Sequence, residues 1–544
     1  MTQVSRLFPA LKPVRLRRLL LAIAVLVTAA GLVAPRPAAA PAASPAASVI
    51  VRELRGAQSR PENLVRSLGG RIDRHIGVIR GFSAELPVDS VDELRASPWV
   101  HSVTRDRRVE LLQFSPSYDP ATDLGSLYNL TRSLEAPEMW KKGYTGRGVG
   151  VALIDSGVVP VNGLNAPGKV VNGPDLSFES QAPNLRYMDS FGHGTHMAGI
   201  IAGRDNAAVP GAYDKKEYAV GVAPDATIVN IKVATYEGAT DVSQILAAID
   251  WVIAHRNDED LNIRVLNLSF GTDGTQDYRY DPLTFAVEAA WRKGIVVVAA
   301  AGNSGFGNAK LNNPAYDPFV IAVGAVKAQG TPDTADDTVP EWSSRGDGTR
   351  NPDVVAPGAS ITSLRAPGSY IDRSNPGGVV HERFFRGSGT SQAAAAVSGA
   401  VALVAQQRPS ATPDQIKKLL MSTATPMPIP DPVSQGSGIV NLENLLTAPT
   451  PRYKQTWLPA TGLGSLRLAR GSATLTDHGV ALDGDADIFG QQWNGATWAA
   501  QSGLAASWLG GVWNGKRWSG DCWCSTSWSG DSWASTTWTG KRWS

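Results

Sequence analysis

The sequence has almost no cysteine: its 544 residues include two, Cys522 and Cys524, both near the C-terminus. Disulfides therefore cannot stabilise the bulk of the chain. With one residue between them, the two thiols could form only a strained bridge, so an intermolecular disulfide or free thiols are the alternatives. Charge imbalance is also lacking, because the formal net charge is +2, and this argues against a nucleic-acid partner.

Long apolar runs are missing except for one near the N-terminus. Arginines precede the run "LLLAIAVLVTAAGLV" (19–33), and the small-residue stretch "APRPAAAPAA" follows it. This order is typical of a secretory signal peptide, which we place at residues 1–40. A retained membrane anchor is the alternative, although the run is shorter than the roughly 20 residues that a spanning helix needs. We therefore expect a secreted or cell-surface protein.

Wholesale disorder is excluded by a hydrophobic content of 43%. A chain of this length predicts several domains, because a domain usually has about 100 to 200 residues. Residues 48–110 alternate strand-like and helix-like stretches, from "SVIVREL" through "PENLVRSLGG" to "PWVHSVTRDRRVEL". They predict a small α+β domain with the order βαββαβ, near the size at which a domain is only marginally stable alone.

From about residue 120 to 447, short apolar runs alternate with amphipathic stretches. The runs are apolar on both faces, as buried parallel strands are. They are "VGVALID" (149–155), "ATIVNIKV" (226–233), "RVLNLSF" (264–270), "IVVVAAAG" (295–302) and "FVIAVGAV" (319–326). Residues 241–256 and 281–294 have helical periodicity, with acidic starts and basic ends. The pattern predicts an α/β domain, a parallel sheet flanked by helices, with its chemistry at the carboxyl ends of the strands.

Polar side chains stand at such ends. Asp155 closes a run in "VALIDSGV", His193 lies between glycines in "FGHGTHMAGIIAG", and Asn303 follows a run in "VVVAAAGNSG". Ser391, in "GTSQAAAAVSG", stands where a helix should begin. Each has an ordinary structural interpretation by itself, since an aspartate in a strand is often structural and a serine at a helix start is often a cap. Their occurrence together requires another explanation.

Taken in order, these motifs resemble those of the subtilisin-like serine proteases, the subtilase family. "NLSFG", "DVVAPG" (353–358) and the closing "GSGIVNLENLL" extend the resemblance over residues 140–445. The order Asp, His, Ser is the one found in subtilisin. The resemblance implies a subtilisin-like catalytic domain at 116–447. It also implies that residues 41–115 are an inhibitory propeptide, an intramolecular inhibitor that is later cut away.

The family assigns roles to the four polar residues. Ser391 is the nucleophile, His193 takes its proton, and Asp155 orients the imidazole and stabilises its charged form. The Asn303 side chain and the Ser391 backbone N–H form the oxyanion hole. Protein or peptide substrates are implied, and no cofactor is required for catalysis.

By the same resemblance, two backbone segments bind the substrate as an extended strand. They contain Ser269, Phe270 and Gly271 on one side and Ala300, Ala301 and Gly302 on the other. Small walls leave the pocket open and apolar, so we expect cleavage after large uncharged residues. "KLNNPAY" (310–316) should shape the pocket floor, and its asparagines could alter this preference.

The chain departs from the family pattern just after the nucleophile. Gln392 replaces the usual Met, and Ala395 replaces the usual Pro, which lets an uninterrupted helix form. Related enzymes often bind structural calcium, but no acidic loop here has the spacing of such a site, and the metal stays unassigned.

The C-terminal part has a different composition. From Trp493 to Trp543, tryptophan recurs every five residues with one gap at Gly503. We interpret 448–489 as a linker that could dock on the tail, and 490–544 as a Trp-repeat tail without an aliphatic core. The alternatives for the tail are a flexible segment, an array that binds glycans or cell wall by ring stacking, or self-association. A competing function follows: a catalytically weak surface-binding protein that acts through this tail.

Overall fold

The computed structural model describes residues 46–106 and 118–504, apart from short gaps, and a few residue pairs beyond them. The gaps are 259, 307–309, 331–332, 474, 478–479 and 489–491, and the pairs are 512–513, 516–517 and 538–539. The predicted signal peptide and both cysteines lie outside the described residues. The chain divides into two compact units, Met1–Leu112 and Gln113–Ser544.

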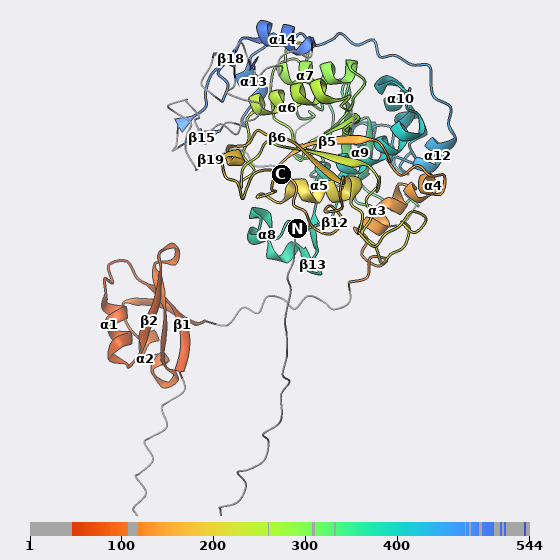
Figure 1. The fold of residues 1–544 in the computed structure, drawn as a ribbon. Helices are drawn as coiled ribbons and strands as arrows, with labels where there is room; N and C mark the ends of the chain where they lie inside the picture. The colour runs from red at the N-terminus through yellow and green to blue at the C-terminus, as the bar shows by residue number, and fades with distance from the viewer. Residues whose placement is uncertain are drawn as a thin grey trace, which may run out of the picture. The chain divides into compact units, whose positions relative to one another are not determined.

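The first unit contains a four-stranded antiparallel sheet with two helices (Figure 1). Its elements are β1 (Ala46–Glu53), α1 (Arg60–Ser67), β2 (Arg71–Ile76), β3 (Gly81–Pro87), α2 (Val91–Arg95) and β4 (Val100–Arg105), and the sheet order is β2-β3-β1-β4. Alternate residues of β1, among them Val49 and Val51, point into a core with Phe82 and Leu94. The predicted βαββαβ order is confirmed.

The second unit is built on a seven-stranded parallel sheet with the order β11-β10-β9-β8-β5-β7-β6. The strands are β5 (Gly150–Asp155), β6 (Val170–Asp175), β7 (Thr227–Lys232), β8 (Ile263–Leu268), β9 (Val296–Ala300), β10 (Ile321–Val326) and β11 (Val354–Pro357). Every residue of β5, β9 and β10 is buried, as expected for strands covered on both faces.

Helices cover both faces of this sheet (Figure 1). On one face α5 (His193–Ala202) packs against α9 (Thr390–Gln407), and on the other α6 (Val242–His255) packs against α7 (Pro282–Arg292). Asp241 and Asp281 cap α6 and α7 through their carboxylates. Helix α9 continues through Ala395 without a break, as the sequence predicts. The α/β fold class is therefore confirmed.

Further elements complete the second unit. They are α3 (Leu127–Ser133), α4 (Ala136–Lys141), β12 (Ile361–Leu364), α8 (Tyr370–Ser374), β13 (Val379–Val380), β14 (Phe384–Gly387), α10 (Pro413–Thr423), α11 (Pro432–Gln435), α12 (Leu442–Thr447), α13 (Leu466–Arg470), β15 (Thr476–Asp477), β16 (Val480–Ala481), α14 (Gly495–Gly503), β17 (Val512–Trp513), β18 (Lys516–Arg517) and β19 (Trp538–Thr539). Within the described ranges, no helix has both the length and the apolar character to cross a membrane.

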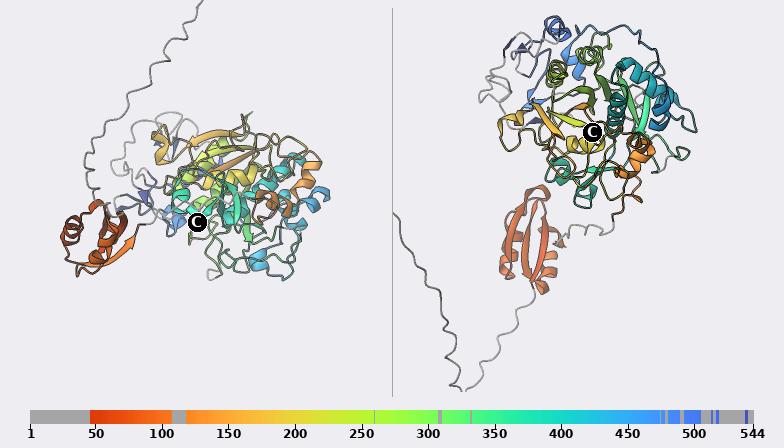
Figure 2. Two further views of the ribbon diagram at one scale, coloured as in Figure 1. Left: turned by 90° about the horizontal axis from the view of Figure 1, so that it is seen from below. Right: turned by 45° about the vertical axis from the view of Figure 1, so that its right-hand side comes forward.

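The described residues of 448–489, interpreted from sequence as a linker, pack against the second unit, and so does the start of the tail at α14. The Ala460 N–H donates to Glu288 of α7, and α14 lies beside α7 (Figures 1 and 2). The fully buried Trp498 donates from Nε1 to Asp250 of α6 at 2.9 Å. The first tryptophans of the repeat therefore belong to the packed domain.

Candidate active site

Asp155 and His193 meet where β5 ends and α5 begins. The Asp155 carboxylate is buried, and its Oδ1 and Oδ2 lie 2.9 and 3.0 Å from His193 Nδ1. Because an ionised carboxylate only accepts hydrogen bonds, Nδ1 carries the proton and Nε2 is left with a lone pair. The histidine is therefore arranged as a base. It is the first residue of α5, whose N-cap is Gly192.

The surroundings of His193 set its basicity. Burial lowers the pKa of the imidazole, but the charge of Asp155 and its hydrogen bond outweigh burial, and the charge of Asp189 adds to them. The pKa of His193 is therefore raised above its usual value. A raised pKa strengthens the base but keeps it protonated, and hence inactive, up to a higher pH.

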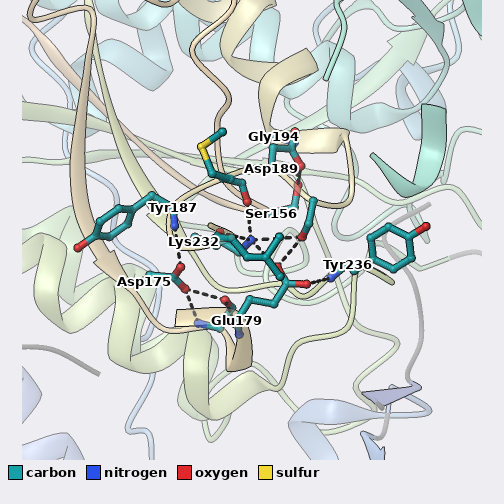
Figure 3. A network of polar contacts seen from close by, with 12 residues as sticks. Ser156, Asp175, Glu179, Tyr187, Asp189, Gly194, Lys232 and Tyr236 are labelled. Atoms are coloured by element: carbon teal, nitrogen blue, oxygen red, sulfur yellow. Dashed lines mark hydrogen bonds and ion pairs between the residues drawn. The ribbon is translucent and has the colours of Figure 1, made fainter. Parts of the chain in front are cut away.

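Asp189 is a buried residue of this site that the sequence interpretation missed. It accepts hydrogen bonds from the backbone N–H of Gly192 (2.6 Å) and of Thr195 (2.8 Å), and from Ser156 Oγ (2.8 Å). Ser156 Oγ in turn accepts from the Gly194 N–H at 2.9 Å (Figure 3). The first amides of α5 are thus bound by side chains next to Asp155. An aspartate shortly before a helix is a capping signal, and that signal could have indicated Asp189.

A buried lysine fixes the loop that carries Asp189. Lys232, at the end of β7, donates to Glu179 Oε2 at 2.6 Å and to the Met188 carbonyl at 2.5 Å (Figure 3). Asp175 holds the same part of the loop by accepting from the Tyr187 N–H at 2.8 Å. A buried charge needs such partners, so this network orders the backbone behind the histidine.

Asp189→Asn is expected to move the acid limb of kcat/KM to lower pH. Removing a nearby negative charge lowers the pKa of His193, so the neutral base persists to lower pH. A pH profile of peptide hydrolysis measures this limb. His196 does not interfere, because burial lowers its pKa to about 4.

Asp175→Asn is the matched control for that experiment. Asp175 is also buried and also accepts backbone N–H bonds in the same network, but it is not among the groups that shift the pKa of His193. Equal shifts in both variants would contradict an electrostatic role for Asp189.

Ser391 is the second residue of α9 and does not cap it. The N-cap is Gly389, without a side-chain capping bond, whereas Ser391 Oγ donates to the Ser269 carbonyl at 2.9 Å. Atoms of Gln392 and His196 lie 2.8 and 3.6 Å from the position that a Cβ of Gly387 would occupy. Side chains of α5 and α9 therefore meet near Gly387, and the two helices, which carry His193 and Ser391 in their first turns, pack against each other.

Asn303 and the Ser391 backbone border one space. Asn303 Oδ1 accepts from the N–H and Oγ1 of Thr390, at 2.9 and 3.0 Å, which directs Nδ2 the other way. A Cβ built on Gly389 would lie 2.8 Å from Gln392 Oε1, 3.2 Å from Asn303 Nδ2 and 3.6 Å from Ser391 N. Two N–H donors beside one space can stabilise an oxygen that acquires negative charge, provided that residue 389 has no side chain.

A cavity of about 300 Å³ opens beside these groups. Five of the six predicted substrate-binding residues line it with Asn303 and Ser391: Ser269, Phe270, Gly271, Ala300 and Gly302. Ala301 does not. It is fully buried, its N–H donates to the Val323 carbonyl and its carbonyl accepts from the Asn312 N–H, so both its backbone groups are used within the fold.

The predicted floor segment contributes one asparagine to the cavity. Asn312 lines it, whereas Asn313 is buried and donates to Asp281 at 3.0 Å. The cavity has a further wall that sequence reasoning missed. This wall comprises Thr240, Asp241, Val242 and Ile245 at the start of α6, and Ala473 from the C-terminal segment.

No metal site can be assigned among the residues that the structure describes. No group of three or more His, Cys, Asp or Glu side chains in this part of the chain is arranged to hold a metal ion.

Comparisons with known proteins identify the family. The sequence profile of the Subtilase family matches residues 146–456. The chain is 38% identical over 322 residues to serine protease AprX of Bacillus subtilis. The aligned region covers 58% of this chain and 70% of AprX. It is also 31% identical over 392 residues to subtilisin E of Bacillus subtilis. That aligned region covers 71% of this chain and 86% of subtilisin E.

A solved structure is also similar. It is that of fervidolysin from Fervidobacterium pennivorans, described as a keratinolytic enzyme related to subtilisin. The sequence identity is 24% and the TM-score is 0.46. The match covers 75% of this chain, but the chain spans only 62% of the fervidolysin chain.

Proposed function

This chain belongs to the subtilase family of peptidases, and from that premise we propose that it is a secreted serine endopeptidase made as a self-inhibited precursor. The observation that carries the proposal is the buried Asp155–His193 pair, with Nδ1 2.9 Å from the carboxylate, on a helix that packs against α9, whose second residue is Ser391. Buried groups whose pKa is shifted by a specific charged partner cluster at sites that move protons.

In the proposed reaction Ser391 Oγ attacks the carbonyl carbon of the scissile peptide bond. His193 Nε2 takes the hydroxyl proton and then gives it to the departing amine as the C–N bond breaks. Water hydrolyses the resulting acyl-enzyme by the same route in reverse order. Asp155 keeps the imidazole in the required tautomer and stabilises the imidazolium.

The oxyanion hole is proposed to be the space between Asn303 Nδ2 and the Ser391 N–H. Attack converts the carbonyl oxygen to an anion, and both donors are already in place around that space. Their fixed orientation means that no reorganisation is needed when the charge develops.

Protein or peptide substrates are proposed to bind as an extended strand along the residues that line the cavity. The small residues Gly271, Ala300 and Gly302 leave it open to a large uncharged side chain, and Asn312 adds a polar group to its floor. Ala301 is left out of this proposal.

The N-terminal parts complete the proposal. The small α+β region precedes the peptidase domain, which is the arrangement expected of an inhibitory propeptide. The apolar run at 19–33 supports secretion.

The surface-binding alternative now concerns the later part of the tail. Trp498 is fully buried against α6, so a truncation that tests glycan or cell-wall contact has to begin after α14. A truncation at residue 490 would instead disrupt the packed domain.

Labelling with a peptidyl phosphonate tests the proposed function. The mature protein is expected to bind about one probe, attached to Ser391 as located by mass spectrometry of the labelled peptide. Ser398→Ala is the matched control, because Ser398 lies on the same helix, is buried, and bonds to Asn267. This variant should label normally. Absence of label on Ser391 in a protein with native circular dichroism would contradict the proposal.

A further inference from the structure

The C-terminal segment Ser465–Ala473, named here the strap, begins with α13 and runs across the start of α6 beside the substrate cavity. It is held there by contacts with the loop after β8. Thr272 Oγ1 donates to the Ala469 carbonyl at 2.5 Å, and the Asp273 carboxylate accepts from the N–H and Oγ of Ser472 at 2.7 and 2.5 Å. The same loop begins with cavity residues, so strap and cavity wall share one framework.

A buried ion pair between Arg470 and Asp241 holds the strap against the start of α6. Arg470 is 1% exposed, Asp241 is 2% exposed, and Arg470 Nε and Nη2 lie 2.6 and 3.1 Å from the Asp241 carboxylate. Arg470 also donates to the carbonyls of Gly484 and Ala486, so its guanidinium charge is well compensated.

Asp241 connects this anchor to the cavity. Its carboxylate caps α6 by accepting from the N–H and Oγ of Ser243, and Asp241 itself lines the cavity. Val242 and Ile245 of the same helix turn line the cavity too, and Ala473 of the strap is a lining residue with them. The position of this apolar wall therefore depends on a residue 229 positions away in sequence.

We propose that the strap is a specificity-determining element of the peptidase. Ala473 limits the size of the apolar substrate side chain that can lie against Val242 and Ile245, and Arg470 is a positioning residue that holds this wall through Asp241. The inference rests on the proposed function. A methyl group at residue 473 leaves room for a substrate side chain, whereas a larger residue would fill that room.

Ala473→Phe tests the inference. A peptide library is varied at each position around the scissile bond, and rates are referred to active enzyme titrated with the phosphonate. At one position, kcat/KM for peptides with Leu or Phe is expected to fall about 10-fold or more relative to peptides with Gly or Ala, mainly through KM. Leu468→Phe is the matched control, because Leu468 lies on the strap but its side chain is exposed and does not line the cavity, so this variant should keep the wild-type profile.

Arg470→Gln tests the positioning role, with Arg467→Gln as its control. Arg467 lies on the same helix but pairs with Asp483 at an exposed site. Arg470→Gln should reduce the discrimination at the same substrate position by about 10-fold, and Arg467→Gln should leave it unchanged. Reduced activity that is equal for all peptides would indicate a merely structural role.

The outcomes separate the two proposals. A wild-type protein that hydrolyses no peptide overturns both. An active wild type, together with a titratable Ala473→Phe enzyme whose profile is unchanged, overturns the role of the strap and leaves the peptidase assignment standing. If Arg470→Gln does not fold, the substrate profile of Ala473→Phe still tests whether the strap determines specificity.

Discussion

Ser391→Ala is expected to lower the turnover number for a peptide substrate by roughly 10⁶, the loss known for the equivalent change in subtilisin. The variant retains Asp155, His193 and Asn303 but has no hydroxyl to form the acyl-enzyme. Alanine is a favourable helix residue, so α9 should form as before. Steady-state hydrolysis of a chromogenic peptide by the purified protein measures the loss.

The same variant tests the precursor. Wild-type protein should yield a shortened mature form, whereas Ser391→Ala protein should stay at full length if the chain processes itself. Ser398→Ala should behave as wild type in both assays, which excludes a general effect of losing a hydroxyl from α9. A near-normal rate for purified Ser391→Ala would mean that the nucleophile has been misassigned.

Asn303→Ala is expected to lower kcat by roughly 10² to 10³ with little change in KM, the size known for the loss of the corresponding donor in subtilisin. The effect falls on kcat because the amide meets full negative charge only in the transition state. Initial rates over a range of substrate concentrations separate the two constants.

Asn303→Asp is the matched variant. It retains an acceptor for the N–H and Oγ1 of Thr390, and so the contacts that order the start of α9. It replaces the Nδ2 donor by an oxygen beside the developing anion, so its kcat should be at least as low as that of Asn303→Ala. If Asn303→Asp were nearly normal, the asparagine would act by ordering Thr390, and the oxyanion assignment would be wrong.

The central strands of the sheet could be predicted because both of their faces are buried. The apolar runs that end at Asp155 and before Asn303 correspond to β5 and β9. The edge strands β6 and β11 escaped prediction. β6 is partly exposed and contains Gly and Pro, and β11 has only four residues, so neither forms a long apolar run.

Asp189, which lies beside Asp155 and His193, shows a second limit of prediction from sequence. Asp189 lies in a loop, and its importance comes from the amides of α5 that converge on it and from its charge near the imidazole. Ala301 shows the reverse case. The place of Ala301 in a family motif suggested a substrate contact, but the Asn312 N–H donates a hydrogen bond to the Ala301 carbonyl.

The sequence by itself determined the parallel α/β fold, the order Asp155, His193, Ser391 and the family, because periodic burial and local motifs are properties of neighbouring residues. Only the tertiary structure decided that Trp498 is a core residue, that Ala301 is absent from the cavity, and that Arg470 and Ala473 adjoin it. The contacts of Arg470 with Asp241 and of Trp498 with Asp250 join residues more than 200 positions apart. Their proximity depends on the whole path of the chain around the sheet, which no short stretch of residues specifies.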